Sequence, residues 1–208
     1  RQEIETAFER NISGDQDGEE VDWRGTIKAI EAEAEKTRDI WLPVYLIRAA
    51  AQSGQFELMV DAAEYFARLL EERWPDVHPQ LDELGFIGRK TPCESLTRHS
   101  EFLRPLSKVV LIEHPRLGSY SGEDFARFDE NGSRADGFGM FKALLEELGD
   151  DALRSIVERV DHLADCIRRA DAVLTENAEG DTATNFQPTY EAIAKIRKGE
   201  IGRASCRE

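Results

Sequence analysis

The chain has 208 residues, enough for one or two domains and for a core that buries roughly 70% of the unfolded surface. Its 42 acidic and 27 basic side chains give a net charge of −15, which repels phosphate backbones and excludes nucleic acid as an expected partner. No apolar run approaches the ~20 residues that cross a bilayer, so we expect no membrane span.

Helical periodicity begins at the N-terminus. Residues 1–11 can form a helix with Ile4 and Phe8 facing inward, and an acidic, glycine-containing loop follows at residues 13–20. Asp22 is a suitable N-cap for a second helix, because its carboxylate can accept from free backbone N–H groups. The apolar positions of that helix lie at helical spacing: Trp23, Ile27, Ile30 and Ala34.

The next two segments predict a helical hairpin. Residues 38–52 form one helix, Gly54 can take the left-handed conformation at the break, and a broad apolar stripe runs from Phe56 to Trp74 before Pro75 ends it. We expect this second helix to lie at the centre of the N-terminal bundle, on the face of Leu42, Tyr45 and Leu46. We interpret Trp74 as a core residue that closes the bundle, and not as an exposed anchor for a partner.

A set of packing motifs runs through these segments. An Asp-Trp pair precedes a helix, an Arg-Asp-Ile-Trp step introduces the next, a glycine lies in the turn, and the aromatic helix ends at a Trp before a His-Pro pair. An arginine and a Pro-Leu step follow downstream. The motif positions are Asp22, Trp23, Asp39, Trp41, Gly54, Trp74, His78, Pro79, Arg89, Pro105 and Leu106.

This pattern resembles the ImpA N-terminal domain of the TssA family, components of the bacterial type VI secretion system; Gly118–Phe125 and Asn185–Pro188 also fit it. The resemblance implies a structural and interaction module that acts in baseplate and contractile-tail assembly. Its partners would be protein subunits of the baseplate, tube or membrane complex. It also implies a cytoplasmic protein that reaches the inner membrane through its partners, and structural roles for the motif residues.

Two departures from the family pattern concern the ends of the chain. The sequence begins at Arg1 without Met, so we expect that the loop introducing the first helix is missing. Nothing after Lys198 resembles the C-terminal oligomerising region of longer members, so homo-oligomers would form through a region missing here. The last residues, 200–208, resemble a translated sequencing adapter, and we give Cys206 no functional weight.

The middle of the chain is less regular. Gly85, Gly88 and Pro92 predict a long connection over residues 84–100. Residues 101–112 end in an apolar run that fits a strand or a helix, and we favour the helix. Residues 113–133 are rich in loop signals, with a short helix around Gly122–Phe128.

The cleanest periodicity lies near the C-terminus. A short helix over residues 138–148 ends at Gly149, and an apolar seam with heptad spacing then continues to a polar loop at 176–185. We interpret the seam as an intramolecular bundle face, against which a last helix at 186–196 folds back. The seam positions are Leu153, Ile156, Val160, Leu163, Ile167, Ala170 and Leu174.

These elements predict an all-α protein, a helical bundle built from helical hairpins with long irregular connections. We divide it into an ImpA-type N-terminal helical region at residues 1–133 and a C-terminal helical hairpin at 134–199 that packs on it. Cys93 and Cys166 show no Cys-x-x-Cys spacing, so free thiols in a reducing cytoplasm are expected.

No chemical motif stands out. The histidines are His78, His99, His114 and His162; we find no His-x-x-x-His and no histidine beside a cysteine at ligand spacing, so we expect no metal. Phosphate-binding loops and nucleophile elbows are also missing, so we expect no enzyme and no cofactor. The alternatives are an unrelated helical adaptor, or an enzyme with an unrecognised acidic site. Carboxylates converging in a deep pocket would favour the enzyme, and a shallow helical surface with exposed aromatics would favour the module.

Overall fold

The structure, a computed structural model, describes residues 2–13, 20–178, 180 and 182–204, with side chains described up to Lys198. The helices are α1 (Gln2–Ser13), α2 (Trp23–Ala34), α3 (Trp41–Gln52), α4 (Phe56–Arg73), α5 (Leu81–Glu94), α6 (Arg104–Lys108), α7 (Gly122–Asn131), α8 (Phe138–Glu176) and α9 (Gln187–Ala204). The strands β1 (Val110–His114) and β2 (Gly118–Ser121) form a small antiparallel hairpin. The predicted all-α bundle is confirmed, with this hairpin as an addition.

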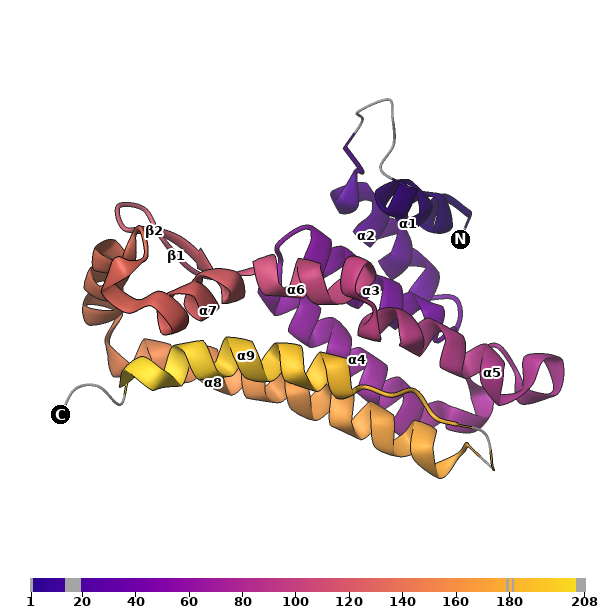
Figure 1. Cartoon of the computed structure of the whole chain (residues 1–208). Helices are drawn as coiled ribbons and strands as arrows, with labels where there is room; N and C mark the ends of the chain where they lie inside the picture. The colour runs from indigo at the N-terminus through magenta and orange to yellow at the C-terminus, as the bar shows by residue number, and fades with distance from the viewer. Residues whose placement is uncertain (1, 14–19, 179, 181, 205–208) are drawn as a thin grey trace.

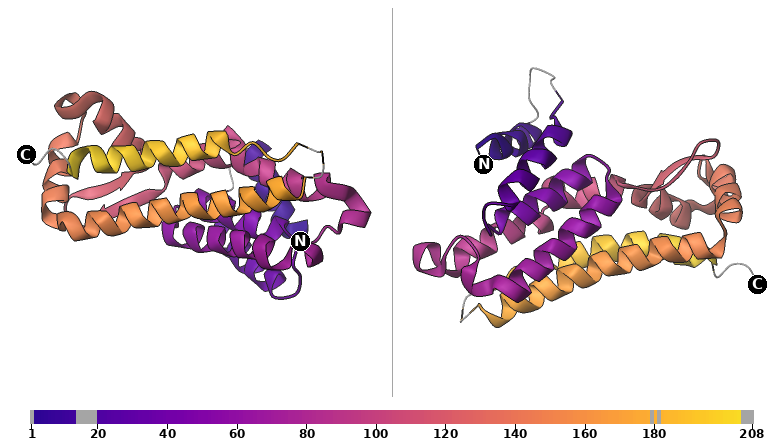
Figure 2. Two further views of the ribbon diagram at one scale, coloured as in Figure 1. Left: turned by 90° about the horizontal axis from the view of Figure 1, so that it is seen from below. Right: turned by 180° about the vertical axis from the view of Figure 1, so that it is seen from behind.

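The helices form layers around α4. Helix α3 packs on one side of α4 and α8 on another, while α9 runs antiparallel alongside α8 (Figures 1 and 2). Helices α2 and α1 continue outward from α3, away from the α8–α9 pair. The β-hairpin and α7 lie at one end of the long axis and α5 lies at the other (Figure 1). Within the described residues, no helix is both long and apolar enough to cross a membrane.

The central position predicted for the Phe56–Trp74 helix is confirmed. Its stripe is enclosed by neighbouring helices, and Met59, Val60 and Phe66 have no exposed surface. Gly54, at φ +70°, makes the tight turn between α3 and α4, as the sequence predicts. The helix ends at Arg73, and Trp74 begins a short 3₁₀ turn in which its ring is partly buried against the core.

A second, aromatic core lies at the hairpin end. Strand β1 pairs Ile112 with Tyr120 of β2, and both side chains pack with α7 and the start of α8. Phe128 stacks on Phe141 with ring centroids 4.7 Å apart. This cluster joins residues from both sides of position 133, and the division of the chain at that position stays a prediction. The buried members are Ile112, Tyr120, Phe125, Phe128, Phe141 and Leu144.

Two local predictions for the middle of the chain are wrong. The helix favoured up to Ile112 ends at Lys108, because the β-branched run that follows pairs with β2. The connection predicted over residues 84–100 is mostly helical, as α5 and two short helical turns. Gly85 supplies a kink at φ +62°, and the helix re-forms beyond it because Phe86, Arg89 and Cys93 turn toward the core.

Helix α8 matches its prediction closely. Gly149, at φ +76°, interrupts the helix where a stop is expected. In the seam beyond it Leu153 and Ile156 are partly buried, and the later positions are buried: Val160, Leu163, Ile167, Ala170 and Leu174. Helix α9 folds back on this seam and continues past the predicted end at Ile196. Residues 205–208, including Cys206, lie outside the described residues, so the adapter-derived origin of the tail at 200–208 stays a prediction.

Arg89 ties α5 to the turn that follows α4. Its side chain is fully buried and donates to the carbonyl oxygens of Trp74 at 2.5 Å, Val77 at 2.6 Å and Pro79 at 3.0 Å. The guanidinium also lies over the Trp74 ring, 4.5 Å from its centroid. Burial lowers the pKa of Arg89, since desolvation disfavours the charged form. The planar fork suits three acceptors arranged around it.

Replacing Arg89 with Met should keep much of the aliphatic volume and leave these three carbonyls without their donors. We expect Arg89→Met to lower the free energy of unfolding by about 2–3 kcal/mol, because buried acceptors that lose a partner are costly. Chemical denaturation followed by circular dichroism measures this. Arg134→Met, at an exposed arginine, is the matched control. Equal stabilities of the two variants would contradict the role assigned to Arg89.

Candidate functional site

The first group of motif residues holds the outer end of the bundle together. Asp22 caps α2 by accepting a hydrogen bond from the Gly25 N–H at 2.9 Å. Trp23 packs at a tilt on Phe8, with ring centroids 5.2 Å apart, and Trp41 stacks on Tyr45 at the same separation. The Trp23 contact joins α2 to α1, the Trp41 contact lies within α3, and Phe8 also stacks on Tyr45 with ring centroids 4.8 Å apart, which links α1 to α3. The two tryptophans therefore contribute to packing.

A second group converges on the turn after α4. His78 forms backbone hydrogen bonds with Arg38 at 2.9 Å and with Ile40 at 3.0 Å. Asp39, between them, is buried and accepts from the Trp41 N–H at 3.0 Å. With Trp74, Pro79 and Arg89, these residues fix one loop against α3 and α5.

The remaining motif positions lie elsewhere. Gly54 is in the α3–α4 turn, and Pro105 and Leu106 are buried in α6. The structure therefore brings the motif residues together in separate packing clusters and not around one chemical centre. Their assignment as the family motif stays a prediction.

An exposed apolar patch lies on α5, at one end of the molecule (Figure 1). Leu81, Leu84 and Ile87 have 44%, 59% and 58% of their surface exposed. We call these three residues the α5 patch. Three large apolar side chains are thus exposed on one helix.

Ion pairs join α4 to α8. Arg159 of α8 donates to Glu57 at 2.8 Å and to Asp61 at 3.1 Å. Arg169, nearly three turns further on, donates to Glu64 at 2.6 Å and makes a two-pronged contact with Glu71 at 2.6 and 2.9 Å. The hydrogen bonds from Arg169 hold the pKa of both Glu64 and Glu71 below the usual range.

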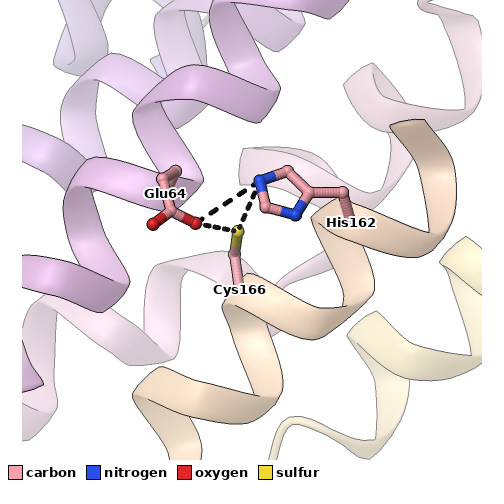
Figure 3. A group of neighbouring side chains, drawn as sticks. All are labelled: Glu64, His162 and Cys166. Atoms are coloured by element: carbon pink, nitrogen blue, oxygen red, sulfur yellow. Dashed lines mark hydrogen bonds and ion pairs between the residues drawn. The ribbon is translucent and has the colours of Figure 1, made fainter. Parts of the chain in front are cut away.

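Between these ion pairs, three different donor atoms meet (Figure 3). The Cys166 Sγ lies 3.2 Å from the Glu64 Oε2 and 3.7 Å from the His162 Nε2, and the two latter atoms are 3.4 Å apart. Cys166 is buried, and Glu64 and His162 are partly exposed. Desolvation, with the hydrogen bond to Glu64 second, raises the pKa of the Cys166 thiol to about 12, so the thiol is protonated in this arrangement.

This cluster is not among the sites predicted from the sequence. The prediction that no histidine lies at ligand spacing from a cysteine is wrong, because His162 and Cys166 are four residues apart on α8 and share one helix face. The expectation of no metal rested partly on that prediction. The spacing was visible in the sequence, but the third member, Glu64, is contributed by a different helix.

An open groove runs along the outer face of α4. Its lining includes Asp61, Glu64 and Glu72 together with Arg38 and Arg68, and Arg68 pairs with Glu72 at 2.9 Å. The carboxylates of this groove are interspersed with arginines. It therefore differs from the deep acidic pocket that the enzymatic alternative leads one to expect.

The contact of Arg169 with α4 should be measurable as stability. We expect Arg169→Gln to lower the free energy of unfolding by about 1–2 kcal/mol, because it removes a two-pronged and partly buried charge contact. The matched control is Arg168→Gln on the same helix, whose arginine is 59% exposed and pairs only within α8, with Asp165 at 3.5 Å, in the described residues. That control should stay within about 0.5 kcal/mol of the parent. Thermal and urea unfolding of both variants test this, and a control loss as large as that of Arg169→Gln would contradict it.

Comparisons with known proteins give a family match and a similar solved structure. Residues 1–98 match the family model described as ImpA, N-terminal, type VI secretion system. No curated protein matches the chain. A solved structure is similar: the N-terminal domain, including the conserved ImpA_N region, of the TssA component of the type VI secretion system from Burkholderia cenocepacia. It has a TM-score of 0.67 and 18% identity over 97% of this chain and 84% of that one, a likeness that shows the fold. Residues 1–98 are therefore similar to the ImpA N-terminal region of type VI secretion systems, and the chain has the fold of that TssA N-terminal domain.

Proposed function

We propose that the chain is a non-enzymatic interaction module that acts in assembling the baseplate and contractile tail of a type VI secretion system. The observation that carries the proposal is the family match over residues 1–98. The contacts of the motif residues support it, since Trp23, Trp41 and Arg89 all serve packing. A rigid helical scaffold with an exposed apolar surface is suited to holding other proteins in place.

The α5 patch is the surface that we propose for partner contact. Apolar side chains that are exposed in the free protein stabilise a complex when a partner removes them from water. Ile87 lies on the part of α5 that Arg89 fixes to the turn after α4, while Leu81 and Leu84 precede the kink at Gly85. A pre-organised surface loses little conformational entropy on binding, which favours affinity.

The partners that we propose are protein subunits of the baseplate, the tube or the membrane complex. The net charge of −15 favours partners with basic surfaces and disfavours nucleic acid. We place the protein in the cytoplasm, at the inner membrane only through its partners.

The test is pairwise binding. The chain is co-expressed with each baseplate, tube and membrane-complex subunit of a type VI system from the same genome, and the dissociation constant of each co-purifying pair is measured by calorimetry. We expect at least one subunit to bind. Failure of all subunits to bind would contradict the proposal and favour an unrelated helical adaptor.

The contribution of the α5 patch is tested in the complex so identified. The double variant Leu84→Asp, Ile87→Asp should raise the dissociation constant by about tenfold or more, since a side chain that is buried in an interface contributes over 1 kcal/mol. Both side chains are exposed, so the melting temperature should stay near that of the parent. Met140→Asp, at an exposed methionine on α8, is the matched control and should bind normally. Unchanged affinity of the double variant would remove the patch from the interface.

A further inference from the structure

We propose that Glu64, His162 and Cys166 form a binding site for a zinc-class divalent metal ion that joins α4 to α8. The three residues offer one oxygen, one nitrogen and one sulfur donor, all within 4.8 Å of one another. This inference is independent of the function proposed above, because it concerns the α4–α8 contact and not the α5 patch.

The geometry of the three donors fits a tetrahedral ion. Zinc lies about 2.3 Å from sulfur and about 2.0–2.2 Å from nitrogen and oxygen, so its ligand atoms are about 3.3–3.6 Å apart in a tetrahedron. The corresponding separations here are 3.2 Å for sulfur to oxygen, 3.4 Å for nitrogen to oxygen and 3.7 Å for sulfur to nitrogen. One ion can therefore touch all three donors after small side-chain adjustments.

The donor types select the class of metal. A thiolate and an imidazole favour zinc and its neighbours in the first transition row, whereas calcium and magnesium prefer sites made of oxygen atoms alone. Figure 3 shows the donors facing one another across the helix interface, with Glu64 on α4 and the other two on α8. His162 and Cys166 are one turn apart on a single helix, so their relative positions are fixed before the ion arrives.

The charges around the site are compatible with a cation. On binding, the Cys166 thiol would lose its proton to solvent, and the resulting thiolate and the Glu64 carboxylate would together balance the two positive charges of the ion. Arg169 is the nearby cation, 2.6 Å from the same Glu64 oxygen. Its two-pronged contact with Glu71 neutralises it, and that contact keeps it in place if Glu64 turns toward the metal. From there, Arg169 would donate a hydrogen bond to the ligating carboxylate of Glu64 and so orient it toward the metal.

Solvent can reach the site. Glu64 lines the open groove on α4, and the side chains of Glu64 and His162 are 31% and 39% exposed. An ion held by three protein ligands would complete its tetrahedron with water on this side. Because Glu64 and Cys166 are 102 residues apart in the chain, the bound ion would link the N-terminal helices to the C-terminal pair.

Cobalt titration tests the site directly. The full chain with Cys206→Ser, which removes the tail thiol as a competing ligand, is stripped with a chelator, desalted and titrated with Co²⁺. We expect one equivalent to bind, with a sulfur-to-cobalt charge-transfer absorption and the intense visible bands of tetrahedral cobalt. Zn²⁺ should displace the cobalt, bleach these bands and raise the melting temperature, because it binds the folded state.

Matched variants assign the ligands in the same background. Cys166→Ser should abolish the charge-transfer band, and His162→Ala and Glu64→Gln should each weaken Co²⁺ binding at least tenfold. Cys93→Ala and His99→Ala, at the other described cysteine and at an exposed histidine, should leave the titration unchanged. Far-UV circular dichroism confirms that each variant is folded. The proposal is overturned if the parent shows no charge-transfer band, or if the band and the affinity survive in the ligand variants.

Discussion

The docking of α8 on α4 is the contact on which the rest of the molecule depends. Apolar side chains form its centre, and charged pairs formed by Arg159 and Arg169 with the carboxylates of α4 flank them. The apolar burial supplies most of the stabilisation, whereas the charges contribute mainly to the register of the two helices. Once this pair is fixed, α3 covers another side of α4 and α9 lies along α8.

Two buried guanidinium groups, those of Arg89 and Arg48, have structural partners and do not form a reactive centre. Arg89 uses its donors on carbonyls of the turn after α4, and Arg48, almost fully buried on α3, pairs with Glu101 at 3.0 Å and lies over the Phe8 ring. Arg89 satisfies carbonyl oxygens that burial would otherwise leave unpaired, and Arg48 shares the Glu101 carboxylate with Arg98. The Arg89 guanidinium contacts the face of the Trp74 indole ring and also donates to the Trp74 carbonyl oxygen. Trp74 and Arg89 therefore stabilise the packed turn together.

Helix positions follow from the sequence where a single face is apolar over several turns, as in α4 and the second part of α8. Prediction fails at α5, because Gly85 and Pro92 have the composition of a loop and the helix depends on tertiary burial of Phe86 and Cys93. For the candidate metal site, too, one part can be predicted from the sequence and the other cannot. The spacing of His162 and Cys166 is a local property of one helix, whereas the approach of Glu64 depends on the register between two helices, which packing across about 100 residues of chain decides.

The register between α4 and α8 brings both Arg169 and the candidate metal ligands Cys166 and His162 to the carboxylate of Glu64. Glu64 is held by Arg169 and faces Cys166 and His162, so its oxygen is the common point of two ways of fastening α8 to α4. The arginine contact needs no cofactor, whereas a metal would add a link whose occupancy depends on the metal concentration. Because Arg169 also rests on Glu71, a metal at Glu64 would supplement the ion pairs and not replace them. The metal would thus strengthen the contact between the N-terminal helices and the α8–α9 pair. It would not change the position of α5, because Arg89 holds α5 to the turn after α4 independently of the metal.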